Sequence, residues 1–350
     1  MAQKVTVALD AMGGDNAPDE IVKGAIQAVE QDTDLYVELV GDRIKISGSH
    51  EDPLNDRITV VDASEVIETS EHPVRAIRAK KDSSMVRALE RVKEGYADAI
   101  LSAGNSGALL VGGQLIAGRI KGIDRPCLAP IIPTPKGPVC LVDAGANMDA
   151  KPSWLLQWAY MGSIYMQKMF EKDLPSVAIV NVGEEEEKGN RLVQEAFPLL
   201  KEAKESGRLG FTGSIEAREI TKGDADVVVC DAFVGNVILK MYEGVADTLL
   251  SEIKKAIMSG TASKIGGMLI KKSLKDLLKT YNAASYGGAV LLGTKGVVVK
   301  AHGNSKADQI SIALGQIASL VRGDIVGEIK TMISTMPVKV SDDDVGGDDG

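Results

Sequence analysis

"KVTVALDAMGGDNAP", residues 4–18, joins a short β-branched apolar run to a turn with two acids, two glycines and a proline. Similar runs recur along the chain and alternate with longer segments of helical periodicity. This alternation is typical of a mostly parallel sheet with helices on both faces, and it predicts a three-layer α/β/α fold. The expected helices cover residues 19–30, 73–94, 106–118, 152–170, 188–205, 236–258 and 305–322.

The composition indicates a globular protein with a large core. The chain has 350 residues, of which 44% are hydrophobic, and no Pro/Ser/Gly linker divides it. We therefore expect a single α/β domain over residues 1–333. Residues 334–350 are acidic and glycine-rich, and this composition predicts a disordered tail.

Charge and hydropathy narrow the functional classes. Forty basic against 49 acidic residues give a net charge of −9, which argues against a nucleic-acid-binding protein. The sequence shows no signal peptide and no apolar run of membrane-spanning length, so we expect a cytoplasmic protein. Three widely spaced cysteines in apolar runs are predicted to be reduced core residues: Cys127, Cys140 and Cys230.

Five further apolar runs end, like the first, in small polar residues. Because the carboxyl ends of parallel strands form the ligand crevice of such sheets, we expect all six loops to converge on one site. Glycine and asparagine let the backbone approach an oxyanion closely, so phosphate is the expected ligand. Neither G-x-G-x-x-G nor G-x-x-x-x-G-K-[ST] occurs, and we expect no nucleotide cofactor. The five loops are SAGNSGA (102–108), DAGANMDAKP (143–152), NVGEEEEKGN (181–190), DAFVGN (231–236) and AHGNSKA (301–307).

These loops, with "RPCLAP" and "YGGAVLLGTKGVVVK", resemble the bacterial phosphate acyltransferases of phospholipid synthesis over residues 4–333. Members of that family convert acyl-[acyl carrier protein] and inorganic phosphate into acyl phosphate. The resemblance implies a fold similar to that of the isocitrate and isopropylmalate dehydrogenases, a homodimer and peripheral membrane attachment. It also implies a downstream glycerol-3-phosphate acyltransferase as a partner. Two small departures from the family pattern are Val290 and Ala232.

The reaction that the resemblance implies needs no covalent nucleophile, because phosphate itself attacks the thioester. Positioning and charge stabilisation should dominate, and we expect no metal and no other cofactor. The candidate catalytic residues are Lys188, His302 and Asn236. The candidate phosphate- and substrate-binding residues are Asp10, Gly13, Gly14, Asp15, Gly104, Asn105, Asp143, Asn147 and Asp231.

Each catalytic candidate also has a structural interpretation. Lys188 follows Glu184–Glu187, which would suit the positive end of a helix dipole. His302 lies at the end of a predicted strand, where it either exchanges a proton with substrate or has a purely structural role. The alternative functions are a phosphate acetyltransferase-like enzyme that acts on acyl-CoA, and a non-enzymatic membrane scaffold. A metal-dependent dehydrogenase is disfavoured, because the loops lack its acidic pair and arginine cluster.

Residues 249–281 interrupt the strand–helix alternation and read as a helical hairpin, inserted at about 245–282, with a break at 259–267. The hairpin is rich in lysine, and its apolar stripe suits a dimer interface. Met258, Ile265 and Met268 are predicted to enter an anionic membrane at its tip. The basic patch would alternatively receive the acidic acyl carrier protein. A second basic segment, with Arg75, Arg78, Lys80 and Lys81, is either a solvated helix face or a lip that meets the carrier.

Overall fold

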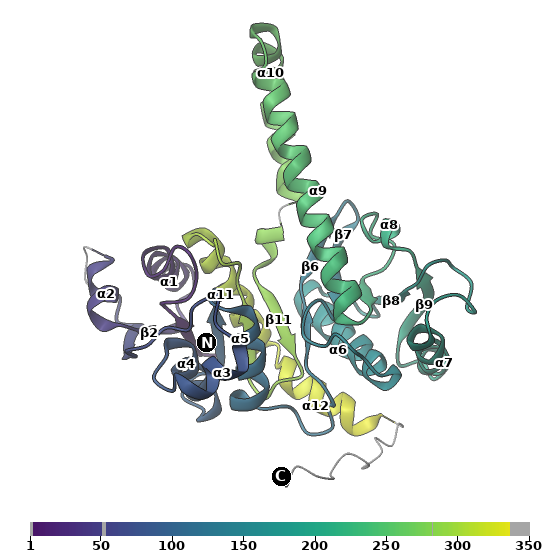
Figure 1. Ribbon diagram of the computed structural model, residues 1–350, viewed down its shortest axis with the longest axis horizontal. Helices are drawn as coiled ribbons and strands as arrows, with labels where there is room; N and C mark the ends of the chain where they lie inside the picture. The colour runs from purple at the N-terminus through teal and green to yellow at the C-terminus, as the bar shows by residue number, and fades with distance from the viewer. Residues whose placement is uncertain (1–2, 51–53, 282, 337–350) are drawn as a thin grey trace.

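The computed structural model describes residues 3–50, 54–281 and 283–336, and most of the predicted tail lies outside these ranges (Figure 1). The strands form two sheets, where the sequence predicted one. The first has seven strands in the order β3-β2-β1-β4-β12-β11-β5, and the second has five in the order β6-β7-β10-β8-β9. Most pairs are parallel; β11 is antiparallel to β12 and β5, and β6 is antiparallel to β7.

The strands of the first sheet are β1 (Val5–Asp10), β2 (Leu35–Gly41), β3 (Ile58–Asp62), β4 (Ala99–Ser102), β5 (Cys127–Ala129), β11 (Ala289–Leu292) and β12 (Val297–Lys300). Those of the second are β6 (Ile131–Thr134), β7 (Gly137–Val142), β8 (Ser176–Val180), β9 (Gly210–Ile215) and β10 (Val227–Val229).

Pro130 marks the passage from one sheet to the other. The strand before it, β5, pairs with β11 in the first sheet, and the strand after it, β6, pairs with β7 in the second. Proline has no N–H to donate to a ladder and is therefore suited to a break between strands. No strand was predicted for this segment, so the division into two sheets was not foreseen.

Helices cover both faces of each sheet. Alternate residues of β1 show this for the first sheet, since Val7 and Leu9 belong to the cluster of α1 and α11, and Ala8 to that of α4 and α5. The second sheet has α6 and α7 on one face and α8 and α9 on the other. The predicted α/β/α layering therefore holds within each sheet. The helices are α1 (Asp19–Gln31), α2 (Arg43–Gly48), α3 (Pro73–Ala79), α4 (Ser84–Lys93), α5 (Ser106–Gly112), η1 (Gly113–Ala117), α6 (Pro152–Phe170), α7 (Arg191–Glu205), α8 (Ala217–Ile220), α9 (Ala232–Met258), α10 (Thr261–Thr280), η2 (Ala283–Tyr286), α11 (Ala307–Arg322) and α12 (Ile325–Thr335).

The helix α6 joins the two halves of the core. It begins at a proline, as the sequence predicted, and it buries Trp158 and Tyr165 completely. Tyr165 accepts a hydrogen bond of 2.8 Å from Gln316 of α11. Residues of both sheets thus share one continuous hydrophobic cluster.

The segment predicted as one helix over 73–94 forms two, α3 and α4. The break follows from Ser83, whose side chain caps α4 by accepting from the backbone N–H of Val86. Such a cap supplies a partner for a free N–H at a helix start, so it favours a new helix over a continuous one.

The two helices α9 and α10 project together from the body (Figure 1). Only Ser259 and Gly260 separate them, so the break is shorter than the predicted 259–267. Gly267 lies inside α10 and packs against Ile257 of α9, where a β-carbon would lie 2.4 Å from the Ile257 side chain.

Within the described ranges, no single helix has the length and apolar composition needed to cross a membrane. The helices α11 and α12 meet that criterion only as a pair, bent by 48° at the break between them.

Candidate functional site

Three loops meet at the carboxyl ends of β1, β4 and β12, and we call residues 10–16, 102–105 and 300–305 the loop cluster. The backbone N–H of Asp15 donates to the carbonyl of Gly303 at 2.7 Å. The Asn16 side chain donates to the carbonyls of Asn304 and Ser305 at 3.0 and 3.2 Å. The prediction that strand ends gather is therefore confirmed for these three loops.

Two glycines permit this close approach. A β-carbon on Gly13 would lie 2.5 Å from an Asp10 carboxylate oxygen and 2.7 Å from the Gly104 nitrogen. Gly14 has φ = +105° and packs against the Gly303 carbonyl, so a side chain there would be strained as well as crowded. The backbone N–H groups of Gly14, Asn105 and Gly303 find no acceptor in the described part of the chain. The cluster thus offers donors to an anion.

Asp10 lies fully buried beneath this cluster. Its carboxylate accepts from the Ser102 hydroxyl at 2.6 Å and from the Met12 N–H at 3.3 Å. Burial raises the pKa of Asp10, although these hydrogen bonds act in the opposite direction. Asp10 therefore links the loop after β1 to the end of β4 and helps to fix the conformation of both.

Asn105 uses its side chain for structure. Its carbonyl oxygen caps α5 by accepting from Ala108, and its amide donates to the carbonyls of Glu68, Thr69 and Glu71. Only the backbone of Asn105 remains to contact a ligand.

Lys300, which the sequence analysis did not select, lies in the same cluster. It ends β12 beside Ser102 of β4, and its ammonium donates to the Ala103 carbonyl at 3.3 Å. Burial lowers its pKa to about 8. The available sequence signal was a lysine that directly follows three valines at the end of a parallel strand.

Asp143 and Asn147 form a second buried group, at the end of β7. Asn147 donates to Asp143 through its side chain at 2.7 Å and its backbone at 2.9 Å. Burial raises the pKa of Asp143, while five donated hydrogen bonds counteract that rise. These contacts fix the loop conformation, and the remaining three come from the N–H groups of Leu128, Gly145 and Ala146.

Asp231 and Asn236 lie at the start of α9. The Asp231 carboxylate caps the helix by accepting from Val234, and the Ala232 N–H donates to the Asn147 carbonyl. The half-buried Asn236 side chain has no hydrogen-bond partner within the described ranges. Asn236 is therefore available to a ligand, whereas Asp231 uses one carboxylate oxygen, Oδ1, to cap the helix.

Lys188 lies in the loop after β8. Its ammonium pairs with Glu185 at 2.7 Å, and this hydrogen bond raises the pKa of Lys188. The preceding glutamates belong to a turn, and α7 begins only at Arg191, so the interpretation of this run as a helix start is wrong. No hydrogen bond or ion pair joins Lys188 to the loop cluster among the described residues.

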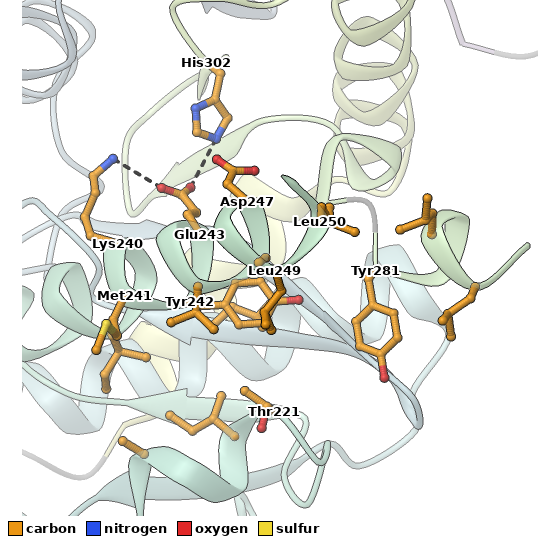
Figure 2. A pocket seen from close by; sticks show the side chains of 18 of the residues that line it. Thr221, Lys240, Met241, Tyr242, Glu243, Asp247, Leu249, Leu250, Tyr281 and His302 are labelled. Atoms are coloured by element: carbon orange, nitrogen blue, oxygen red, sulfur yellow. Dashed lines mark hydrogen bonds and ion pairs between the residues drawn. The ribbon is translucent and has the colours of Figure 1, made fainter. Parts of the chain in front are cut away.

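His302 connects the loop cluster to α9. Its Nε2 lies 3.4 Å from Oε1 of Glu243, and the ammonium of Lys240 lies 3.3 Å from the other carboxylate oxygen, Oε2 (Figure 2). The hydrogen bond with His302 is the main reason why the pKa of Glu243 is lowered. Glu243 and Lys240 were not among the predicted site residues, because only the folded chain brings α9 to this loop.

A groove of about 1230 Å³ runs along α9 from these three polar residues. Apolar side chains of α9 and α10 line most of its length, and α8 contributes to the opposite wall. Figure 2 shows Met241, Leu249, Leu250 and Tyr281 along it. The groove is therefore polar at the end near His302 and mainly apolar beyond, although Arg218, Asp247 and Lys275 also line it.

The three cysteines are buried and free, which confirms them as core residues. Burial raises the pKa of each thiol, so none is poised as a nucleophile. In residues 3–50, 54–281 and 283–336, no group of three or more His, Cys, Asp or Glu is arranged to hold a metal.

Solved structures share this architecture. A phosphotransacetylase from Streptococcus pyogenes aligns over 90% of this chain and 93% of its own with a TM-score of 0.58 and 15% identity. A branched-chain phosphotransacylase from Enterococcus faecalis aligns over 91% and 99% with a TM-score of 0.52 and 16% identity. At these identities the likeness shows the fold alone.

Sequence relatives are much closer. The family model described as "Fatty acid synthesis protein" matches residues 5–327. A phosphate acyltransferase from Alkaliphilus oremlandii is 49% identical over 332 residues, which is 94% of this chain and 98% of that protein. One from Clostridium perfringens is 46% identical over 330 residues, 94% and 96% of the two chains. The chain thus belongs to the phosphate acyltransferase family and is an enzyme of that kind.

Proposed function

We propose that this phosphate acyltransferase converts acyl-[acyl carrier protein] and inorganic phosphate into acyl phosphate and free carrier, for membrane phospholipid synthesis. The observation that carries the proposal is the long apolar groove that ends at His302, beside the loop cluster. An acyl chain in the groove would place its thioester carbonyl near the phosphate donors.

The chemistry follows from this placement. A phosphate oxygen attacks the thioester carbonyl carbon, and a tetrahedral oxyanion forms. The C–S bond then breaks, and the carrier thiolate leaves and takes up a proton. Backbone N–H groups of the loop cluster and Asn236 stabilise the negative charges of the phosphate and the oxyanion. Lys188, in the loop after β8 of the second sheet, is the candidate cation. His302 is the candidate proton donor, oriented by Glu243.

The groove favours a long acyl chain over acetyl. Each buried methylene contributes about 0.8 kcal/mol to the free energy of binding, so an apolar groove of this size binds a long chain more tightly than a short one. An enzyme of the phosphate acetyltransferase type, which acts on a short acyl-CoA, would leave most of the groove empty.

Arg75 and Arg78 support docking of the acidic carrier. Both are exposed on α3, and neither has an ion pair within the described ranges, whereas Lys80 pairs with Glu71. The start of α3 adjoins the loop cluster, because a β-carbon on Gly107 would lie 2.5 Å from the Pro73 ring. This basic face would bring the carrier to the mouth of the site.

The projecting pair α9–α10 supports a homodimer that attaches peripherally to an anionic membrane. Apolar residues of the pair that do not line the groove are exposed in the single chain, including Leu269 and Ile270, and a second copy would cover them. Met258, Ile265 and Met268 are more than half exposed near the free end, where they would enter lipid. Exposed lysines on the same pair would attract anionic headgroups: Lys254, Lys255, Lys264, Lys271, Lys272 and Lys275.

The experiment crosses three donors with two conditions: palmitoyl-carrier, palmitoyl-CoA and acetyl-CoA, each with and without inorganic phosphate. We expect acyl phosphate only with phosphate, and fastest from the carrier thioester. Arg75→Glu/Arg78→Glu should raise KM for the carrier thioester and leave that for acyl-CoA unchanged. Equal rates with carrier and CoA donors would reject acyl carrier protein as the preferred acyl donor. Faster turnover of acetyl-CoA would favour the acetyltransferase-like alternative.

A further inference from the structure

Lys300 is a partly buried cation without a direct counter-ion. Its ammonium donates to the carbonyls of Ala103 and Ala301, which accounts for two of its three protons. No carboxylate oxygen of the described residues lies within 4.0 Å of it. Burial of an unpaired ammonium is unfavourable, so the site is suited to an anion that arrives with the substrate.

The charged groups around Lys300 act from a distance. Asp10 of β1 and Asp15 of the following loop favour its charged form, and Lys240 of α9 opposes it. The Asp10 carboxylate is itself engaged by Ser102 and Met12. Burial outweighs these effects and lowers the pKa of the ammonium to about 8.

The Ala103 carbonyl oxygen fixes where the ammonium lies in the loop cluster. This oxygen is 3.3 Å from Lys300 Nζ, 3.4 Å from the position of a β-carbon on Gly14, and 3.9 Å from that on Gly303. The ammonium and these two glycines, whose N–H groups lack an acceptor among the described residues, are therefore gathered around the same carbonyl oxygen.

We propose that Lys300 binds the inorganic phosphate, donating the third proton of its ammonium to a phosphate oxygen alongside the N–H groups of Gly14 and Gly303. This inference rests on the proposed function, and it adds the cation that the phosphate site requires. A dianion is the ligand of choice, because one oxygen meets the ammonium while others accept from the backbone.

The experiment compares the wild type with Lys300→Met, Lys300→Arg and Lys295→Met. Lys295 is an exposed lysine of the β11–β12 turn, so Lys295→Met is the matched control. Phosphate binding is measured as the rise in Tm on addition of inorganic phosphate, against chloride at equal ionic strength. KM for phosphate and KM for the acyl thioester are measured in parallel.

We expect Lys300→Met to weaken phosphate binding about 10- to 100-fold, the range for loss of one hydrogen bond to a charged group, with the thioester KM within about 2-fold of the wild type. Lys295→Met should match the wild type, and Lys300→Arg should recover part of the phosphate affinity. Unchanged phosphate binding in folded Lys300→Met would overturn the inference, and so would an equal rise in both KM values.

A pH titration of the wild type tests the inference even if Lys300→Met does not fold. Above pH 8 inorganic phosphate stays a dianion, whereas the Lys300 ammonium loses its proton. Phosphate affinity should therefore fall between about pH 8 and pH 10, and constant affinity over that range would reject the inference. Phosphate binding without any acyl phosphate formation would reject the proposed function alone.

Discussion

The glycines of the loop cluster lie in crowded surroundings, whereas Gly266 of the projecting pair α9–α10 lies in open space. In the loop cluster, glycines have no room for a side chain, as at Gly13, because loops from distant parts of the chain touch there. In α10, a β-carbon on Gly266 would meet nothing within 4 Å. The loop cluster packs three loops closely together and leaves the N–H groups of Gly14, Asn105 and Gly303 without an acceptor among the described residues, whereas the pair α9–α10 exposes apolar surface. The contrast suggests that the chemistry resides in the first and the attachment in the second.

A matched pair of glycine substitutions gives the largest expected effect. Gly13→Ala should lower the free energy of unfolding by about 3 kcal/mol, because it forces a methyl group against Asp10 and Gly104. Gly266→Ala should raise it by up to about 1 kcal/mol, because alanine favours an exposed helix. Urea denaturation measures both. If the two variants changed stability in the same direction, the contrast between the regions would fail.

The second-largest effect is expected when the candidate catalytic side chains are removed. His302→Ala and Lys188→Ala should each slow acyl phosphate formation by about 10²-fold, the usual cost of a lost proton donor or oxyanion partner. The measurement is kcat with saturating phosphate and thioester, with circular dichroism as the control for folding. Near-normal turnover of either folded variant would assign that residue a structural role.

A smaller effect is expected where α9 touches the loop cluster. Glu243→Gln keeps the shape of the side chain but removes the charge beside His302, and it should lower kcat by about 10-fold. A positioning role also predicts that the pH dependence of kcat shifts, which a purely structural change would not cause. Glu252→Gln, farther along α9, is the control and should leave the pH profile unchanged. An unaltered pH dependence of kcat in Glu243→Gln would show that Glu243 does not position His302, so that α9 has no part in the chemistry of the loop cluster.

The smallest effect on turnover is expected near the free end of the hairpin. Ile265→Glu/Met268→Glu should weaken binding to anionic liposomes by about 30-fold, since the two side chains together lose roughly 2 kcal/mol of apolar burial. Dimerisation and turnover of soluble substrate should stay unchanged. Flotation with liposomes and light scattering measure these properties, and unchanged flotation would reject this segment as the anchor.

Local signals predicted much of the fold, and long-range packing accounts for most of what they missed. The helix α6 was expected over 152–170 and has those bounds, because Pro152 marks its start and its apolar residues keep helical spacing. The division into two sheets was missed because it depends on the partners of β5 and β6, which no local pattern around Pro130 reveals.

The site was predictable to a similar degree. Strand ends rich in glycine and asparagine indicated the loop cluster, and the close approach of Gly13 to Gly104 bears this out. The contribution of Lys300 was not predictable, because a lysine after three valines gives no sign of how deeply its ammonium is buried. The occupied side chain of Asn105 is a similar case, since its partners lie more than 30 residues away.

Varying the length of the acyl chain shows whether the apolar groove holds the acyl chain of the donor. The measurement is kcat/KM for acyl phosphate formation from acyl-carrier thioesters with acetyl, octanoyl and palmitoyl chains at fixed phosphate. We expect kcat/KM to rise about 10²-fold or more from acetyl to palmitoyl, because the added methylenes are buried in the groove. Equal kcat/KM values across the series, or a maximum at acetyl, would contradict it.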